Sequence, residues 1–230
     1  MKPLATSPET SSLTREEEQA AVIRRLEEDI IFGRFAPGSR LVEDTLMTRY
    51  SASRHFVRQG LFQLERQGIV LREKNIGATV RFYSAEEVRQ IYEVREMLTR
   101  QAALMIALPA PDSLIEQLSE LQRHYCARAD AQDLRGIHEA NDAFHVALFS
   151  ASGNPYLVRS LRDYMNLTLP MRAKNLADRE GLALSRRQHE IMIELLQGRD
   201  NWALAQLCVE HMQFSKADYL ARIAGDTGER

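Results

Sequence analysis

The sequence predicts a mainly α-helical protein in two parts: three helices closed by a β-hairpin, and then an all-α antiparallel helical bundle. Three observations lead to this fold class. Apolar residues recur at helical spacing through most of the 230-residue chain. Alternating β-prone residues are confined to residues 69–82, around Asn75 and Gly77. After Ser84 no strand signal is found, and glycines and prolines divide the remainder into helical segments.

The first part begins at Thr14, which together with Glu17 has the form of a capping box. Residues 1–13 are rich in Ser, Thr and Pro, and we expect a disordered tail there. Helices are predicted from Thr14 to Gly33, at 42–50 and at 53–66, and β-strands at 69–73 and 78–82. Three helices and a hairpin in this order are typical of a winged helix-turn-helix, which we assign to residues 14–82.

The second part follows a short linker, residues 83–85. Its predicted helices span 85–107, 111–128, 133–151, 155–174, 180–197 and 200–223. Each is about 15–24 residues long, enough to cross a small domain, and short connections favour antiparallel neighbours. We assign residues 86–224 to this helical domain and 225–230 to a tail.

Composition excludes several classes of protein. No apolar run reaches the about 18 residues of a transmembrane helix, and two cysteines build neither a disulfide framework nor a cysteine-rich zinc site. Residues 31–81 carry nine basic and four acidic residues, a net of +5, whereas residues 82–230 carry 17 and 21, a net of −4. This asymmetry favours a DNA-binding module joined to a domain that does not bind DNA. We expect a cytoplasmic protein with no membrane partner.

The third predicted helix has the pattern of a recognition helix. Val57, Leu61 and Leu64 share one face, and polar residues occupy the other. Such a helix packs on its apolar side while its polar N-terminal side enters the major groove. A solvated surface helix is the plainer interpretation, but the preceding helix and the basic hairpin favour DNA binding. The candidate DNA-binding residues are Ser53, Arg54, His55 and Arg58 on the helix, and Arg72, Lys74, Asn75 and Gly77 on the hairpin.

Three helices of the second part carry histidines that could converge. Asn141 and His145 are four residues apart and share a helix face, while His189 and His211 lie on two later helices. Three imidazoles with an open position suit a transition metal. Ordinary hydrogen-bonded histidines explain the same residues, and His138 with Asp142 forms a competing pair at the same spacing.

Several motifs in the first part resemble the GntR-type winged helix-turn-helix. They are the turn Pro37-Gly38-Ser39-Arg40-Leu41, the stretch Ser53-Arg54-His55-Phe56-Val57-Arg58, and the ending Leu61-Phe62-Gln63-Leu64-Glu65-Arg66-Gln67-Gly68. The resemblance covers about residues 20–82. Phe56 stands where that family usually has Pro, and Gly60 where it usually has Ala, so the operator sequence does not follow from the resemblance.

The second part resembles the FCD effector domain of the FadR subgroup over about residues 86–222. Asn141-Asp142-Ala143-Phe144-His145, followed by Ser152-Gly153-Asn154, is similar to its Asp/Asn-x-x-Phe-His and Ser-Gly-Asn stretches. The resemblance implies a divalent metal, zinc or nickel, that helps to hold a small carboxylate effector. It places Arg95 at the effector, although Thr99 stands where the family usually has Glu. The implied metal ligands are Asn141, His145, His189 and His211; in the alternative, the same histidines bind the effector directly.

We therefore expect a metabolite-responsive DNA-binding transcriptional regulator that holds double-stranded operator DNA as a homodimer. Release from DNA by a small organic acid, and hence repression without it, is the commoner outcome in the family that the chain resembles. Two alternatives stay open: a metal-dependent enzyme using the three-histidine site with Glu190 or Asp142 as base, and a DNA-binding dimer without an effector. The effector, the metal and the operator sequence are not identified by the sequence.

Overall fold

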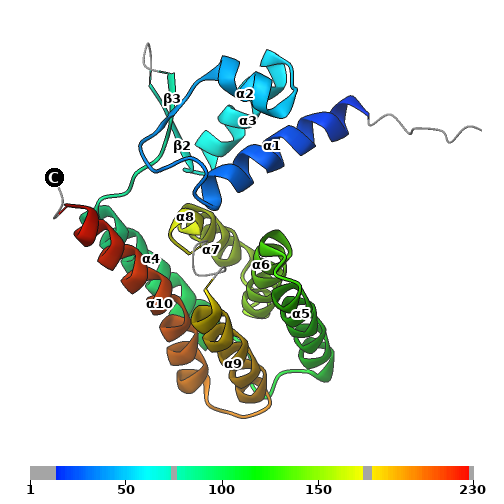
Figure 1. Cartoon of the computed structure of the whole chain (residues 1–230). Helices are drawn as coiled ribbons and strands as arrows, with labels where there is room; N and C mark the ends of the chain where they lie inside the picture. Colours follow the sequence, from blue (N-terminus) through cyan, green and yellow to red (C-terminus); the bar gives the residue numbers. More distant parts are fainter. Residues whose placement is uncertain (1–13, 74–76, 173–177, 228–230) are drawn as a thin grey trace, which may run out of the picture.

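The structure, a computed structural model, describes residues 14–73, 77–172 and 178–227. Figure 1 shows a head, from α1 to β3, above a body, from α4 to α10. The head contains α1 (Arg15–Ile31), β1 (Arg40–Leu41), α2 (Glu43–Tyr50), α3 (Arg54–Arg66), β2 (Val70–Glu73) and β3 (Gly77–Val80). The body contains α4 (Ala85–Leu104), α5 (Asp112–Asp130), α6 (Leu134–Ser150), α7 (Pro155–Leu167), α8 (Leu169–Arg172), α9 (Arg179–Leu196) and α10 (Asn201–Thr227). The predicted mainly helical class, a winged helix-turn-helix followed by a helical domain, is confirmed.

Capping boxes start α1 and α4 at the residues that the sequence indicates. The Thr14 hydroxyl accepts from the amide of Glu17 at 3.3 Å, and the Glu17 carboxylate accepts from the amide of Thr14 at 2.7 Å. Ser84 and Glu87 repeat the arrangement at 3.2 and 2.9 Å. Each box satisfies two amides that have no partner within the helix, so the local sequence sets these two starts.

The sheet has one strand more than the predicted hairpin. Its order is β1-β3-β2, and both pairs are antiparallel. The extra strand places Arg40 opposite Thr79 and Leu41 opposite Ala78. Two residues are too short to show the alternation by which a strand is recognised in a sequence. This pairing ties the hairpin, or wing, to the segment that leads into α2.

The predicted helix over 155–174 is interrupted. Helix α7 ends at Leu167, and the short α8 begins at Leu169 after Thr168. Pro170 has no amide hydrogen and its ring conflicts with the carbonyl four residues earlier, which breaks the helix here. Residues 173 and 174 of the predicted helix lie outside the described residues.

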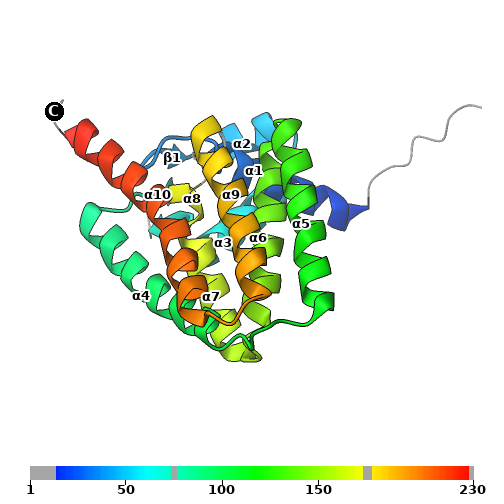
Figure 2. The same cartoon turned by 90° about the horizontal axis from the view of Figure 1, so that it is seen from below.

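In the body, α4 packs against α10 and α5 against α6, with α9 contacting both α5 and α10. Figure 2 shows these helices from below, with α4 and α10 on one side and α5 and α6 on the other. The largest core cluster of the body includes Ala102, Leu118, Phe144, Leu148, Met192 and Leu204. No helix in the described ranges is long and apolar enough to cross a membrane.

Head and body meet through specific contacts. Tyr83, in the predicted linker, is fully buried and donates a hydrogen bond to the carbonyl of Gly68 at 2.6 Å. An ion pair of 2.9 Å joins Glu28 on α1 to Arg135 on α6. Leu169 of α8 is 3% exposed and belongs to the hydrophobic core of the head. A residue of the body thus completes the core of the head.

Candidate functional site

The outward face of α3 carries the residues predicted to contact DNA. Arg54, His55 and Arg58 are exposed. Ser53 caps the helix by accepting a hydrogen bond from the amide of Phe56 at 3.3 Å. The Phe56 side chain itself is buried in the head core. The solvent side of the helix start is therefore polar and carries two guanidinium groups.

Both guanidinium groups of α3 are paired with carboxylates at the start of α2. The Arg58 Nε donates to the two oxygens of Glu43 at 2.9 and 3.0 Å, and this hydrogen bond raises the pKa of Arg58. The Arg54 Nη2 lies 2.5 Å from Oδ1 of Asp44. Ion pairs between exposed side chains add little stability. Their main effect here is to hold the two guanidinium groups in place on the outward face of α3.

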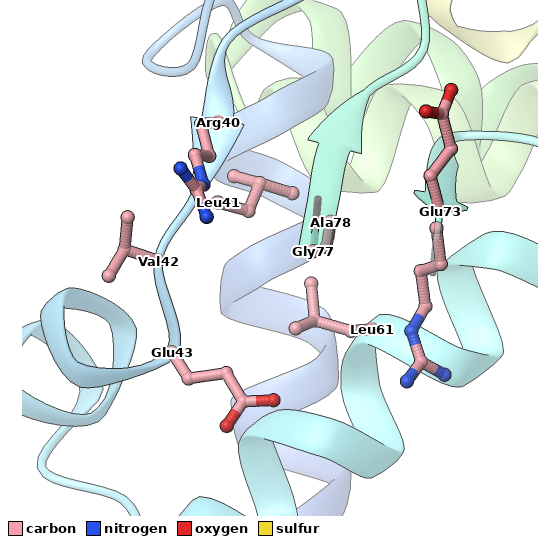
Figure 3. A pocket seen from close by; sticks show the side chains of 9 residues that line it. Arg40, Leu41, Val42, Glu43, Leu61, Glu73, Gly77 and Ala78 are labelled. Atoms are coloured by element: carbon pink, nitrogen blue, oxygen red, sulfur yellow. The ribbon is translucent and has the colours of Figure 1, made fainter. Parts of the chain in front are cut away.

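A hollow separates α3 from the wing (Figure 3). Glu43 and Leu61 line it from the helices, and Gly77 and Ala78 from β3. Gly77 is exposed with φ +99°, in the left-handed region that favours glycine. The predicted wing residue Arg72 is exposed and lies 3.4 Å from Glu65. The other two predicted wing residues, Lys74 and Asn75, lie outside the described residues.

Three of the predicted metal ligands meet inside the body. His145 of α6, His189 of α9 and His211 of α10 bring ligand nitrogens within 4.8 Å of one another. The Nε2 atoms of His145 and His211 are 3.1 Å apart. The fully buried ring of His189 stacks on Phe144 with centroids 4.2 Å apart. Packing of three helices therefore brings together imidazoles that are far apart in the sequence.

The environment of these imidazoles keeps them neutral. Burial first, and then neighbouring positive charge, lowers the pKa of His211 to about 3. Burial first, and then the neighbouring His211, holds the pKa of His145 and of His189 well below the usual value. Neutral imidazole is the form that binds a metal. Two nitrogens on a tetrahedral zinc ion would lie about 3.3 Å apart, close to the distance between His145 and His211. These side chains fit a divalent metal ion.

The fourth predicted ligand, Asn141, is buried and lines the same cavity as His145. Its neighbour Asp142 forms an ion pair with Arg172 of α8, at a distance of 2.8 Å. The competing His138–Asp142 contact is longer, at 3.8 Å. Burial lowers the pKa of His138 to about 4, so this imidazole is neutral at pH 7. Arg172 is therefore the charged partner of Asp142.

Arg95 also lines this cavity and is buried. Its Nη1 donates to the hydroxyl of Thr168 at 2.8 Å. Burial lowers the pKa of Arg95 to about 10, so the group is a cation at neutral pH. Arg172 gives the cavity a second guanidinium group. The cavity has a volume of about 40 Å³, room for an ion or a few atoms without rearrangement.

Sequence reasoning assigned no role to two glutamines beside the histidines. Gln122 of α5 lies 2.9 Å from Nδ1 of His189, and Gln188 of α9 lies 2.8 Å from Nδ1 of His211. Gln122 shares a helix face with the buried residues Leu118 and Tyr125. A glutamine on an apolar helix face needs a polar partner inside the protein, and that is the signal by which it could have been found.

Comparison with known proteins places both parts of the chain. Residues 18–80 match "Bacterial regulatory proteins, gntR family", and residues 90–214, more than half of the chain, match the FCD domain. The Nta operon transcriptional regulator of Aminobacter aminovorans is 26% identical over 181 residues, covering 78% of this chain and 83% of that protein. The transcriptional repressor RspR of Escherichia coli is 24% identical, covering 84% of each.

Solved structures share the fold. McbR/YncC of E. coli superposes with a TM-score of 0.69 at 20% identity, covering 92% of this chain and all of that one. A putative GntR transcriptional regulator from Rhodococcus sp. RHA1 gives a TM-score of 0.63 at 22% identity, covering 90% and 97%. The domains matched are those of transcriptional regulators, not of enzymes.

Proposed function

Because the chain belongs to the gntR family of bacterial regulatory proteins and carries an FCD domain, and is thus a DNA-binding transcriptional regulator, we propose that it is a repressor released by a small carboxylate. Within the family we place it in the FadR subgroup. Since its target is operator DNA, we place it in the bacterial cytoplasm. The observation that carries the effector proposal is a buried cavity in which neutral imidazoles lie beside two guanidinium groups.

The head would bind operator DNA through α3. Arg54 and Arg58 are the cations on its outward face, and an arginine pair with guanine contributes about 1–3 kcal/mol of discrimination. Ser53 and the first amides of α3 would hold a backbone phosphate. Arg72 and Gly77 on the wing would contact the backbone or the minor groove.

The body would bind the effector at the histidine cavity. We propose that Asn141, His145, His189 and His211 hold a divalent metal, zinc or nickel, and that a carboxylate oxygen would enter as a fifth ligand. Arg95 would pair with the same carboxylate, because a guanidinium group binds a carboxylate in a bidentate manner. The small volume of the cavity favours an acid of few atoms.

A route from this cavity to the head runs through α8. Arg95 donates to Thr168, and the next residue, Leu169, is packed in the head core. A carboxylate that bound Arg95 would compete with Thr168 and so change the preferred position of α8. An effector acts only through such a difference between two arrangements, and about 1–3 kcal/mol of coupling is typical.

We also propose that the protein acts as a homodimer, which two-fold symmetric operator DNA favours. Two large apolar side chains on the body, Met97 of α4 and Trp202 of α10, are 58% and 66% exposed. Such side chains are candidates for burial against a second copy. Light scattering on the wild type and on a Met97→Ser, Trp202→Ser double variant tests this; a dimer that the double variant leaves intact would place the contact elsewhere.

The test of the whole proposal is a gel shift on the DNA upstream of the protein's own gene. The complex is titrated with a panel of small carboxylic acids, with and without EDTA. We expect at least one acid to release the DNA, and EDTA to weaken that response. Binding that no acid and no chelator alters would indicate a DNA-binding dimer without an effector.

Two sets of variants separate the sites. Arg54→Ala with Arg58→Ala should abolish specific operator binding while leaving the helical circular dichroism unchanged. His145→Ala or His211→Ala should retain operator binding, lose bound metal and blunt the acid response. Metal analysis of protein purified without chelator gives the independent measurement. Wild-type protein that holds no metal, together with an unchanged response in the histidine variants, contradicts the metal assignment.

A further inference from the structure

His189, one histidine of the cluster, makes a hydrogen bond to the side-chain amide of Gln122, and a second hydrogen bond fixes the orientation of that amide. The Gln122 side chain is buried between α5 and α9. Its Nε2 donates to the backbone carbonyl of Arg186 at 3.0 Å, and it also lies 3.6 Å from the sulfur of Cys126. A carbonyl oxygen only accepts hydrogen bonds, so the amino group of Gln122 must face Arg186. The Gln122 oxygen must then face the opposite way.

That oxygen faces His189. Oε1 of Gln122 lies 2.9 Å from Nδ1 of the imidazole. Because an amide oxygen cannot donate, the hydrogen of this bond belongs to His189 Nδ1. A neutral imidazole carries one hydrogen, so the other nitrogen, Nε2, keeps a free lone pair.

The free nitrogen of His189 belongs to the cluster of imidazoles in which a metal ligand is needed. Nε2 of His189 is buried and has no hydrogen-bond partner in the part of the chain that the structure describes. The three imidazole rings form a nearly equilateral triangle, with centroid distances of 5.1 Å from His189 to His145, 4.9 Å from His189 to His211 and 4.8 Å from His145 to His211. A buried nitrogen without a partner is costly unless something occupies the position in front of it.

We propose that Gln122 is a positioning residue: anchored by the Arg186 carbonyl, it holds His189 in the Nδ1–H tautomer and so prepares Nε2 to bind a divalent cation. The role in metal binding rests on the proposed function, whereas the tautomer does not. Gln188 makes a similar contact with His211, but no second bond within the described residues fixes its amide. The inference is therefore confined to Gln122.

The first test uses metal-free wild-type protein. Nitrogen-15 correlation spectra of the histidine rings, recorded on the full chain after treatment with EDTA, distinguish the two neutral tautomers. We expect His189 to carry its hydrogen on Nδ1. Observation of the Nε2–H tautomer in the wild type overturns the proposal, whatever the variants do.

The second test compares Gln122→Met with a matched control. Methionine has a similar length but accepts no strong hydrogen bond, so the His189 tautomer should shift toward Nε2–H. Loss of such an outer contact typically weakens metal affinity by about 10–100-fold. We expect this loss in titrations with Co²⁺, with a changed visible spectrum of the bound ion. Gln117→Met, at an exposed position of the same helix, should match the wild type in every measurement.

The outcomes separate the two proposals. Equal Co²⁺ affinity and an unchanged tautomer in folded Gln122→Met overturn the role of Gln122 while leaving the metal site standing. A wild-type protein that binds no Co²⁺ overturns the metal assignment, and the spectra of the metal-free protein still decide whether Gln122 sets the tautomer. If Gln122→Met does not fold, the wild-type spectra alone decide.

Discussion

The two carboxylate oxygens of Glu43 accept hydrogen bonds from Nε of Arg58, at 2.9 and 3.0 Å. The bond joins the first residue of α2 to the outward face of α3. Since it uses Nε–H, it leaves the two terminal amino groups of Arg58 available for the acceptors of a guanine. Glu43 is thus placed to orient Arg58 without competing for the base that we propose Arg58 reads.

The first prediction concerns this orientation. Glu43→Gln should reduce the discrimination between operator and scrambled duplex by about tenfold, within the 1–3 kcal/mol of a good arginine–guanine pair. Affinity for the scrambled duplex should stay level or rise, because a negative charge is removed. Fluorescence anisotropy on both duplexes measures the ratio. Glu73→Gln, at a carboxylate that lines the same hollow, is the control; equal loss in both variants would argue for a general charge effect.

The second prediction concerns the neighbouring pair. Asp44 is 76% exposed and pairs with Arg54, so it competes with DNA phosphates for that cation. Asp44→Asn should therefore tighten binding to any duplex and steepen the dependence of affinity on salt by about one ion. Titrations at several salt concentrations give the slope. Asp112→Asn on α5 serves as the control, and a slope that Asp44→Asn leaves unaltered counts against competition by Asp44.

The third prediction concerns a buried carboxylate in the head. Asp29 accepts hydrogen bonds from Arg34, Arg49 and Tyr50 at 2.6, 2.5 and 2.9 Å. Burial alone would raise the pKa of Asp29, but these bonds lower it overall. Asp29→Asn should lower the free energy of unfolding by about 1–3 kcal/mol at pH 7, because the charge-assisted hydrogen bonds of the buried carboxylate are weakened or lost.

The sign of the pH dependence follows from the lowered pKa of Asp29. The stabilisation is complete above the unfolded-state pKa of about 3.9 and is lost as the pH falls through the lower folded-state pKa. Urea unfolding curves of wild type and Asp29→Asn should therefore converge below about pH 4. A stability difference that is the same at pH 7 and pH 3 would show that the charge is not responsible.

The fourth prediction uses two glycines of the head. A Cβ added at Gly60 would meet Ile23 and Leu26 side chains at 3.5 and 3.6 Å, ordinary contact distances, so Gly60→Ala should stabilise α3 by up to about 1 kcal/mol. At Gly68, φ is +74° and a Cβ would lie 2.6 Å from Leu167, so Gly68→Ala should destabilise. Melting temperatures that move in the same direction in both variants would contradict this account.

The fifth prediction tests the contact of α8 with the head. Leu169→Ala should destabilise the protein by about 2–5 kcal/mol, the usual effect of truncating a buried leucine. Hydrogen exchange should accelerate in α1 and α3, although the mutation lies in the body. Met105→Ala, at a position 40% exposed and away from the histidine cavity, should leave exchange in the head unchanged. Protection in α1 and α3 that survives Leu169→Ala would mean that α8 does not support the head.

Local sequence signals predicted most of the helices. Thr14 with Glu17 and Ser84 with Glu87 cap helices through contacts three residues apart, and such contacts need no tertiary information. Strand β1 was not predicted, since Arg40 and Leu41 become a strand only by pairing with β3. The break at Thr168 was missed although Pro170 indicates it, because the apolar pattern continues across the proline.

At the candidate site too, some features follow from local sequence signals and others only from tertiary packing. Helical spacing put Asn141 and His145 on one face, the helical pattern put His189 and His211 on two later helices, and the resemblance assigned all four to a metal. The glutamine that holds His189, the pairing of Arg172 with Asp142 and the burial of Arg95 could not be predicted. Each depends on the packing angle between helices far apart in the chain.

The class of fold, the polar outward face of α3 and the imidazoles available to a ligand all follow from the sequence alone. These properties follow from periodicity, capping and charge, which are local. The packing of the folded chain sets which nitrogen of His189 is free, which carboxylate pairs with each arginine, and that Leu169 belongs to the core of the head. Hydrogen bonds and close packing depend on distances of a few tenths of an ångström between distant segments, and these distances are set only when the whole chain has folded.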